Sequence, residues 1–365
     1  MEPFASVPEQ PEAKRLLQAA LAEGPAHAYL FHGPPGVGKT TAAFAFAAVL
    51  LGDERRVLAR AHPDLYVLEP LGEMIRIDDI RALRHDLHLR PFEGERRVYL
   101  VLAADRLNED AADALLKDLE EPPAYAVVVL VASELGALPP TIVSRCQLVP
   151  FRRLSEPAVR AWIAAEAPDR GEDEVRALAR AAAGRLDRAR RLLDPEAVAR
   201  RDALVAIARA TYLEPEFDPG AAAATLLSGA SERGREARER EAAAVEALDL
   251  PAREAELRLR RAQRGAEREE LLATLEGLEA WYRDLVVVSA GAETVAVHAD
   301  RLEALREDAA RVSAEAAVVA AEAVRETWRA LEEFNLNTPL ALEALFVRLG
   351  RELRAGLPAS ARTVF

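Results

Sequence analysis

The sequence predicts an α/β fold in which a parallel sheet carries helices on both faces, followed by a long all-helical region. Before residue 153, uninterrupted apolar segments alternate with amphipathic helical segments. Apolar segments of this kind are typical of parallel strands that are buried on both sides. After residue 154 such segments cease, and nearly all of the remaining chain has helical periodicity. Because 365 residues are too many for one ordinary core, we expect two or three domains.

The elements of the first part can be placed in order. We expect strands at 27–31, 64–70, 96–104 and 126–133, and helices at 9–23, 40–51, 78–90 and 108–121. Asp78 and Asp79 suit the start of a helix, where carboxylates interact favourably with the helix dipole. Pro122 and Pro123 end the helix before them, since proline cannot continue it.

Composition and charge exclude several classes of protein. Half of the residues are apolar and 30% are charged, which is the profile of a soluble globular protein. The net charge of −13 argues against a strong, autonomous nucleic-acid binder, which needs concentrated positive charge. No apolar run is long enough to span a membrane, and the N-terminus lacks the pattern of a signal peptide. We therefore expect a cytoplasmic protein.

Metal and thiol chemistry have little support in the sequence. Cys146 is the sole cysteine, so it forms no internal disulfide and builds no cysteine-based zinc site. We interpret it as a small packing residue. The six histidines show no HExxH or comparable metal-binding spacing.

The stretch "FHGPPGVGKT" at residues 31–40 matches the phosphate-binding P-loop, in which backbone N–H groups surround the phosphates. Lys39 would reach the β and γ oxygens, and the Thr40 hydroxyl would meet Mg²⁺. The strand, loop and helix predicted around it are the context that this motif requires. The alternative is a glycine-rich turn without a ligand. The expected nucleotide-binding residues of the loop are Gly33, Pro34, Pro35, Gly36, Val37, Gly38, Lys39, Thr40 and Thr41.

The sequence lacks the acidic pair with which hydrolysing P-loop enzymes hold Mg²⁺ and polarise water. Where the relevant strand would end in Asp-Glu, this chain has Leu102 and Ala103. Asp105 lies three residues beyond Leu102, about 10 Å along an extended chain, which is too far for a magnesium ligand. Glu69 and Glu134 follow strands that we expect elsewhere in the sheet. We therefore hypothesise a pocket that binds ATP and hydrolyses it poorly.

Several segments together resemble the AAA+ subunits of bacterial DNA polymerase III clamp loaders. These segments are "HAYLFHGPPGVGKTTAA", "HPDLYVLEP", "VYLVLAADRLNEDAADALLKDLEEPP" and "LPPTIVSRCQLVPFRRL", within residues 1–155. The segments "LLKDLEEPP" and "TIVSRC" are more specific than the P-loop. Near the other end, "WYRDL" at 281–285 and "FNLNTPLALEALFVRL" at 334–349 resemble the helical collar of the same family, whereas 198–275 resembles it weakly. The resemblance implies a nucleotide-binding domain at 1–153, a helical lid at 154–197 and a collar at 198–365.

The departures from the family pattern favour the delta prime kind of subunit over the gamma/tau motor. The acidic pair is absent, and the short "GDERRVLARA" stands where the family has a four-cysteine zinc insert. The resemblance thus implies a component of the polymerase holoenzyme without zinc and with little ATPase activity of its own. Its implied partners are gamma/tau and delta subunits, the sliding clamp and, through the complex, primed DNA. A gamma/tau-type motor and a P-loop kinase are the alternatives.

The resemblance also implies roles for individual residues. Arg145, in the family's "SRC" segment, would act as an arginine finger on a nucleotide bound by a neighbouring subunit. The alternative is an ion pair on the surface. Arg188, in "GRLDRA", resembles the phosphate-sensing arginine of the second domain, although Asp187 stands beside it. Ser133 falls in the region of the first polar sensor.

Two further sets of residues have structural alternatives. Residues 231–268 are rich in Arg and Glu, and we interpret them as a solvated helical face with i,i+4 ion pairs. Contact with DNA is the alternative for Arg258, Arg260, Arg261 and Arg264. We also expect three aromatic residues to pack between helices and not to stack on bases: Trp281, Tyr282 and Phe334.

Overall fold

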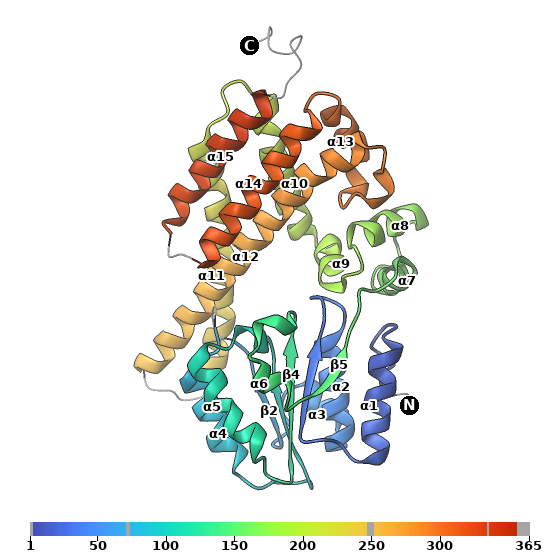
Figure 1. Cartoon of the computed structure of the whole chain (residues 1–365), viewed down its shortest axis with the longest axis vertical. Coiled ribbons are helices and arrows are strands. Elements are labelled where there is room, and N and C mark those ends of the chain that lie inside the picture. Colours follow the sequence, from blue (N-terminus) through green and yellow to red (C-terminus); the bar gives the residue numbers. More distant parts are fainter. Residues whose placement is uncertain (1–2, 71–73, 247–251, 334–335, 356–365) are drawn as a thin grey trace. The chain divides into compact units, whose positions relative to one another are not determined.

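The computed structural model describes residues 3–70, 74–246, 252–333 and 336–355 (Figure 1). The chain divides into two compact units. The first comprises Met1–Trp162 together with Gly184–Asp187, and the second comprises Ile163–Ala183 and Arg188–Phe365. The predicted fold class, a parallel α/β module followed by a helical region, is confirmed.

The first unit contains a five-stranded parallel sheet in the order β2-β3-β4-β1-β5. Its strands are β1 (Ala28–His32), β2 (Leu65–Leu68), β3 (Arg97–Val101), β4 (Ala126–Ala132) and β5 (Gln147–Pro150). The strand β1 lies between β4 and β5, and its last residue, His32, pairs with Ala132 and Pro150. The segment after β1 therefore leaves the sheet at the carboxyl end, flanked by the ends of two neighbouring strands.

Helices cover both faces of this sheet, as predicted (Figure 1). Phe31 on one face packs in a cluster with residues of α1 and α2, whereas Leu30 on the other packs with residues of α4 and α5. This alternation follows from the period of two along a strand. The helices of the first unit are α1 (Pro11–Glu23), α2 (Lys39–Leu51), α3 (Glu54–Leu58), α4 (Ile77–Leu87), α5 (Glu109–Glu120), α6 (Pro140–Val143) and the start of α7 (Glu156–Glu166), with the 3₁₀ turns η1 (Ala104–Arg106) and η2 (Leu135–Ala137).

The described part of the second unit is helical. Trp281 and Tyr282 are buried at its centre, so their predicted packing role is confirmed, and Phe334 lies outside the described residues. The long helices α11 and α12 lie side by side (Figure 1). The elements are the end of α7, α8 (Glu172–Ala181), α9 (Leu186–Leu193) from Arg188 onward, α10 (Pro195–Leu213), α11 (Pro219–Glu246), α12 (Ala252–Ser289), η3 (Glu293–Val295), η4 (Ala299–Arg301), α13 (Leu302–Ala309), α14 (Ala314–Glu333) and α15 (Thr338–Ala355).

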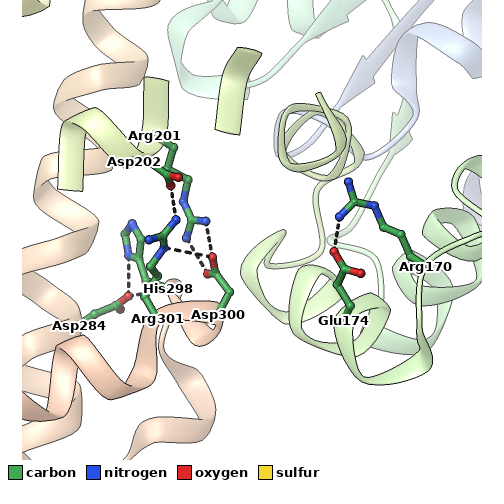
Figure 2. Close-up of polar contacts among 8 residues, drawn as sticks. All are labelled: Arg170, Glu174, Arg201, Asp202, Asp284, His298, Asp300 and Arg301. Carbon is green, nitrogen blue, oxygen red and sulfur yellow. Dashed lines mark hydrogen bonds and ion pairs between the residues drawn. The ribbon is translucent and has the colours of Figure 1, made fainter. Parts of the chain in front are cut away.

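A buried polar cluster holds the η3–η4 segment against α10 and α12 (Figure 2). Asp284 accepts hydrogen bonds from the backbone N–H groups of Val297 and His298 at 3.0 and 2.7 Å, and its Oδ2 lies 2.9 Å from His298 Nδ1. Arg201 forms a two-pronged ion pair with Asp300 at 2.7 and 2.8 Å. Burial lowers the pKa of His298. Because Trp281 packs edge-on against the His298 ring at 5.3 Å, the Asp284–His298 pair is part of the core.

Figure 2 also shows an ion pair between Arg301 and Asp202 and another between Arg170 and Glu174. The first joins η4 to α10, and the second stabilises the start of α8 through two residues four positions apart. These pairs order the helical unit and include no residue that the sequence assigned to a site.

Candidate nucleotide-binding site

The P-loop lies between β1 and α2, so the predicted strand, loop and helix arrangement is confirmed. Gly33 begins the loop with a φ of +137°, and a Cβ at this position would lie 2.1 Å from the carbonyl oxygen of Phe151. A side chain therefore cannot be accommodated at Gly33 without moving the chain that follows β5. The loop leads directly into the N-terminus of α2, where unpaired backbone N–H groups favour anions.

Lys39 is the central charged residue of the loop. Its side chain is 6% exposed, and Nζ donates hydrogen bonds to the carbonyl oxygens of Gly33 and Pro34 at 2.5 and 2.6 Å. Burial lowers the pKa of Lys39 to about 8, while the charges of Asp105 and Asp187 oppose this shift. The ammonium group is thus held by its own loop at the place where a phosphate would bind.

The lowered pKa of Lys39 predicts a particular dependence of stability on pH. Between about pH 8 and 10.5 the unfolded chain keeps a proton that the folded chain has lost, so the free energy of unfolding rises with pH. Relative to Lys39→Met, the parent chain should therefore gain roughly 1–3 kcal/mol across this window. Urea unfolding at pH 7 to 10 measures the difference. The control is Lys117→Met, which removes an exposed lysine. A difference in the free energy of unfolding between the parent and Lys39→Met that does not change with pH would contradict the prediction.

The remaining predicted loop residues surround this lysine. Val37 is buried, whereas Thr40 and Thr41 are exposed on the first turn of α2. The Thr40 hydroxyl is therefore accessible to a metal ion. The glycine loop, the helix N-terminus and Lys39 fit the phosphates of a nucleotide, and Thr40 fits one ligand position of Mg²⁺.

A side chain that the sequence analysis missed connects the loop to the chain near the N-terminus. Gln10 is 5% exposed, and its Nε2 donates hydrogen bonds to the carbonyl oxygens of Arg152 and Val37 at 2.7 and 3.3 Å. Its Oε1 accepts one from the backbone N–H of Arg152 at 3.0 Å. No local pattern could have identified this contact, because Gln10 and Arg152 are 142 positions apart.

Gln10 also borders a cavity of about 610 Å³. This volume is within the range of ordinary small-molecule sites. The cavity is lined by Glu9, Gln10, Pro11, Glu12, Lys14, Pro150, Arg152 and Arg153.

The chain after β3 does not continue in an extended conformation. Leu102 and Ala103 follow the strand, so no carboxylate occupies the positions of the usual acidic pair. However, Ala103 has a left-handed conformation with φ 53°, and the chain then turns through η1. Asp105 is thereby brought to the end of β4, where its Oδ2 accepts a hydrogen bond from the backbone N–H of Ser133 at 3.2 Å. The predicted separation of about 10 Å along an extended chain does not apply, because the chain reverses at Ala103.

The other acidic residues considered from the sequence lie in different surroundings. Glu69 follows the edge strand β2 and forms an ion pair with Arg60 at 2.7 Å. Glu134 is exposed and follows β4, which pairs directly with β1. The structure thus places β4, the strand that Glu134 follows, directly beside the strand that leads into the P-loop.

Arg145 lies between α6 and the edge strand β5. Its guanidinium forms an ion pair with Glu120 at 2.5 Å and donates a hydrogen bond to the carbonyl oxygen of Thr141 at 2.9 Å. Its side chain is 34% exposed. The neighbouring Cys146 packs against an apolar cluster, and burial raises the pKa of its thiol to about 12, so it is not a reactive thiolate at neutral pH.

The segment Gly184–Asp187 lies against the P-loop within the first unit. Leu186 donates a backbone hydrogen bond to the carbonyl oxygen of Gly36 at 2.7 Å. The contact at the loop is therefore made by Leu186 and Asp187. Arg188 begins the next part of the second unit, where it forms an ion pair with Glu276.

The arginines proposed as alternative DNA contacts lie on α12, and two of them, Arg258 and Arg260, form ion pairs with acidic residues. Arg258 pairs with Glu241, and Arg260 pairs with Glu256 at 2.7 Å. Arg238 on α11 reaches the same Glu256, also at 2.7 Å. These contacts support the interpretation of this region as a helical face with internal charge pairing.

Among the described residues there is neither a cluster suited to bind a metal ion nor a helix suited to span a membrane. In the ranges given above, no group of three or more His, Cys, Asp or Glu side chains is placed to hold a metal ion. Nor does any helix in those ranges have both the length and the apolar character that crossing a bilayer requires.

The first unit is similar to known subunits of DNA polymerase III. A family model described as "DNA polymerase III, delta subunit" matches residues 9–155. The delta prime subunit of Bacillus subtilis (strain 168) is 34% identical over 163 residues, which are 41% of this chain and 50% of that protein. The tau subunit of the same strain is 31% identical over 170 residues, covering 43% of this chain and 30% of the relative.

A solved structure of a DNA polymerase III gamma subunit-related protein from Thermotoga maritima is 18% identical, with a TM-score of 0.43 over 93% of this chain and 99% of that one. The chain spans about half the length of the delta prime relative and less of the tau relative. The chain is thus similar, over part of its length, to delta prime subunits of DNA polymerase III, and the resemblance predicted from the motifs is confirmed.

Proposed function

We propose that this chain is a delta prime-like subunit of a bacterial DNA polymerase III clamp loader that binds ATP but hydrolyses it poorly or not at all. The similarity of residues 9–155 to delta prime subunits supports membership of the complex. Its partners would be gamma/tau and delta subunits, the sliding clamp and, through the complex, primed DNA. The chain would help the complex to open the clamp and load it.

One observation carries the proposal of weak hydrolysis: the P-loop after β1 is intact, whereas β3 of the same sheet ends without acidic residues. Lys39 is in place, whereas Leu102 and Ala103 occupy the positions after β3. A phosphate-binding lysine and a helix N-terminus provide affinity for nucleotide. Without a carboxylate to position the attacking water and complete the magnesium site, they do not provide turnover.

The residues of the site have defined parts in this proposal. The loop N–H groups and Lys39 would hold the phosphates, and the Thr40 hydroxyl would contact Mg²⁺, which neutralises phosphate charge when it is bound.

Arg145 has a different part, because it would act on a neighbouring subunit. It lies next to β5 at the edge of the sheet and is partly exposed. From such a place a guanidinium can reach a nucleotide held by another chain and stabilise charge on the transferring phosphoryl group. Its ion pair with Glu120 is exposed, and such pairs contribute only about 0–1 kcal/mol to stability. Replacing this pair with a contact to a phosphate group would therefore cost little free energy.

A gamma/tau-type motor is the second function that a specific observation favours. Asp105 folds back toward the P-loop, and its charge acts on Lys39. A tau subunit is also similar to this chain, over 43% of its length. If Asp105 completes a magnesium site after all, the chain would hydrolyse ATP without help from another subunit.

Assembly tests the proposal most simply. Purified chain should form a stable complex when it is mixed with gamma/tau and delta subunits, and size-exclusion chromatography with light scattering measures the mass. Elution of every subunit at its own mass, under conditions in which the other subunits are folded, would contradict the proposal.

A further inference from the structure

A short segment of the chain is fixed against the P-loop from outside. Leu186 donates its backbone N–H to the carbonyl oxygen of Gly36 at 2.7 Å. Gly184 has a φ of +78°, and a Cβ there would lie 2.6 Å from the carbonyl oxygen of Leu154. The segment from 184 to 187 is therefore anchored both to the P-loop and to the chain that follows β5.

This anchoring places the Asp187 carboxylate directly over Gly36. A Cβ on Gly36 would lie 1.8 Å from Asp187 Oδ1 and 2.5 Å from its Cγ, so the carboxylate occupies the space beside the loop backbone. Arg185 fixes its orientation by donating from Nε to Oδ1 at 3.1 Å and from Nη2 to Oδ2 at 2.7 Å. The Arg185 side chain is 10% exposed, which limits its freedom to turn away.

The carboxylate also acts on the lysine of the site. The negative charge of Asp187 favours the protonated form of Lys39, whereas the positive charge of its partner Arg185 acts in the opposite direction. A P-loop attracts anions through its N–H groups and its lysine. Here an anionic side chain of the same chain already lies against the loop, and it would repel an incoming phosphate.

We propose that Asp187 sets the nucleotide affinity of this P-loop by occupying the space over Gly36 with a carboxylate, which must withdraw before a triphosphate can seat. The inference rests on the proposed function only in taking the P-loop as the nucleotide site. It assigns a role to a residue that the sequence singled out merely as the neighbour of Arg188. The chain is thereby held in a closed state of low affinity when no nucleotide is present.

Nucleotide titration of a charge-neutralised variant tests the inference. Like-charge contacts at binding sites lower affinity strongly, so Asp187→Asn should bind MgADP and MgATP roughly 10- to 100-fold more tightly than the parent. Asp187→Ala, which also removes side-chain volume, should show at least as large an increase in nucleotide affinity. Isothermal titration calorimetry on the full chain measures the dissociation constants. The control Asp173→Asn removes the same charge from a side chain that is 96% exposed and should leave them unchanged.

Three outcomes would overturn the inference, provided that circular dichroism and thermal melting show folded variants. The first is that Asp187→Asn binds nucleotide no more tightly than the parent. The second is that only Asp187→Ala shows a higher affinity, and the third is that no variant binds nucleotide at millimolar concentration. The assembly experiment is independent of these results. If Asp187→Asn does not bind nucleotide more tightly but the complex assembles normally, the role of Asp187 is refuted and the clamp-loader proposal stands. If Asp187→Asn binds more tightly but the complex does not assemble, the clamp-loader proposal is refuted and the role of Asp187 stands.

Discussion

Replacing Arg145 by alanine is expected to lower the ATPase rate of a reconstituted complex with gamma/tau and delta subunits by roughly 10³-fold at the site that it serves. The physical reason is that a planar guanidinium can donate two hydrogen bonds to phosphoryl oxygens while their charge rearranges. The steady-state ATPase rate should be measured in a complex in which only the motor site served by Arg145 can hydrolyse ATP. Other sites in the complex would otherwise hide the effect.

Two controls separate this role from a general effect of losing an arginine. Arg81→Ala removes an exposed arginine that also forms an ion pair, with Asp78, and should leave the rate unchanged. Arg145→Lys keeps the charge but not the planar fork, so we expect partial activity at most. The complex should assemble normally in each case, since the pair with Glu120 is exposed. Undiminished ATPase in Arg145→Ala would refute the finger.

The second large effect concerns the isolated chain, which should hydrolyse bound ATP more slowly than about 1 s⁻¹, the lower end of the usual range for enzymes. Leu102 is 6% exposed and apolar, and Ala103 has no polar side chain, so neither can bind Mg²⁺ or orient a water molecule. The carboxylate that follows these two residues, Asp105, is hydrogen-bonded through Oδ2 to the backbone N–H of Ser133.

Asp105→Asn distinguishes the two functions because it removes only the charge. In a non-hydrolysing subunit the slow residual rate should not change. In a motor that relies on Asp105, the same substitution should reduce the rate of ATP hydrolysis roughly 10²- to 10⁴-fold, which is the usual effect of removing a general acid or base.

Much of the first unit follows from local patterns. Uninterrupted apolar strands, the glycine loop and the helix that begins at Lys39 all lie within a few residues of where periodicity and spacing put them. These signals are local, because strand burial, glycine conformation and helix starts depend on neighbouring residues. The third strand was predicted to run to residue 104 but ends at Val101, because the left-handed turn at Ala103 stops it.

The parts that sequence reasoning missed depend on contacts between distant segments. Ala103 gives no warning of a left-handed conformation, which is uncommon outside glycine, so the return of Asp105 to β4 was not visible. The positions of Gln10 and Asp187 beside the P-loop likewise depend on segments far from it along the chain. Short-range patterns carry no information about which side chain closes such a contact.

One measurement tests the central claim, that this chain holds ATP without consuming it. ATP binding and phosphate release should be followed in the same sample of isolated chain with Mg²⁺, with Lys39→Ala as the variant that cannot hold phosphate. We predict saturable, Lys39-dependent binding with phosphate release below about 1 s⁻¹. Lys39-dependent release clearly above that rate, abolished by Asp105→Asn, would contradict the account and identify the chain as a motor.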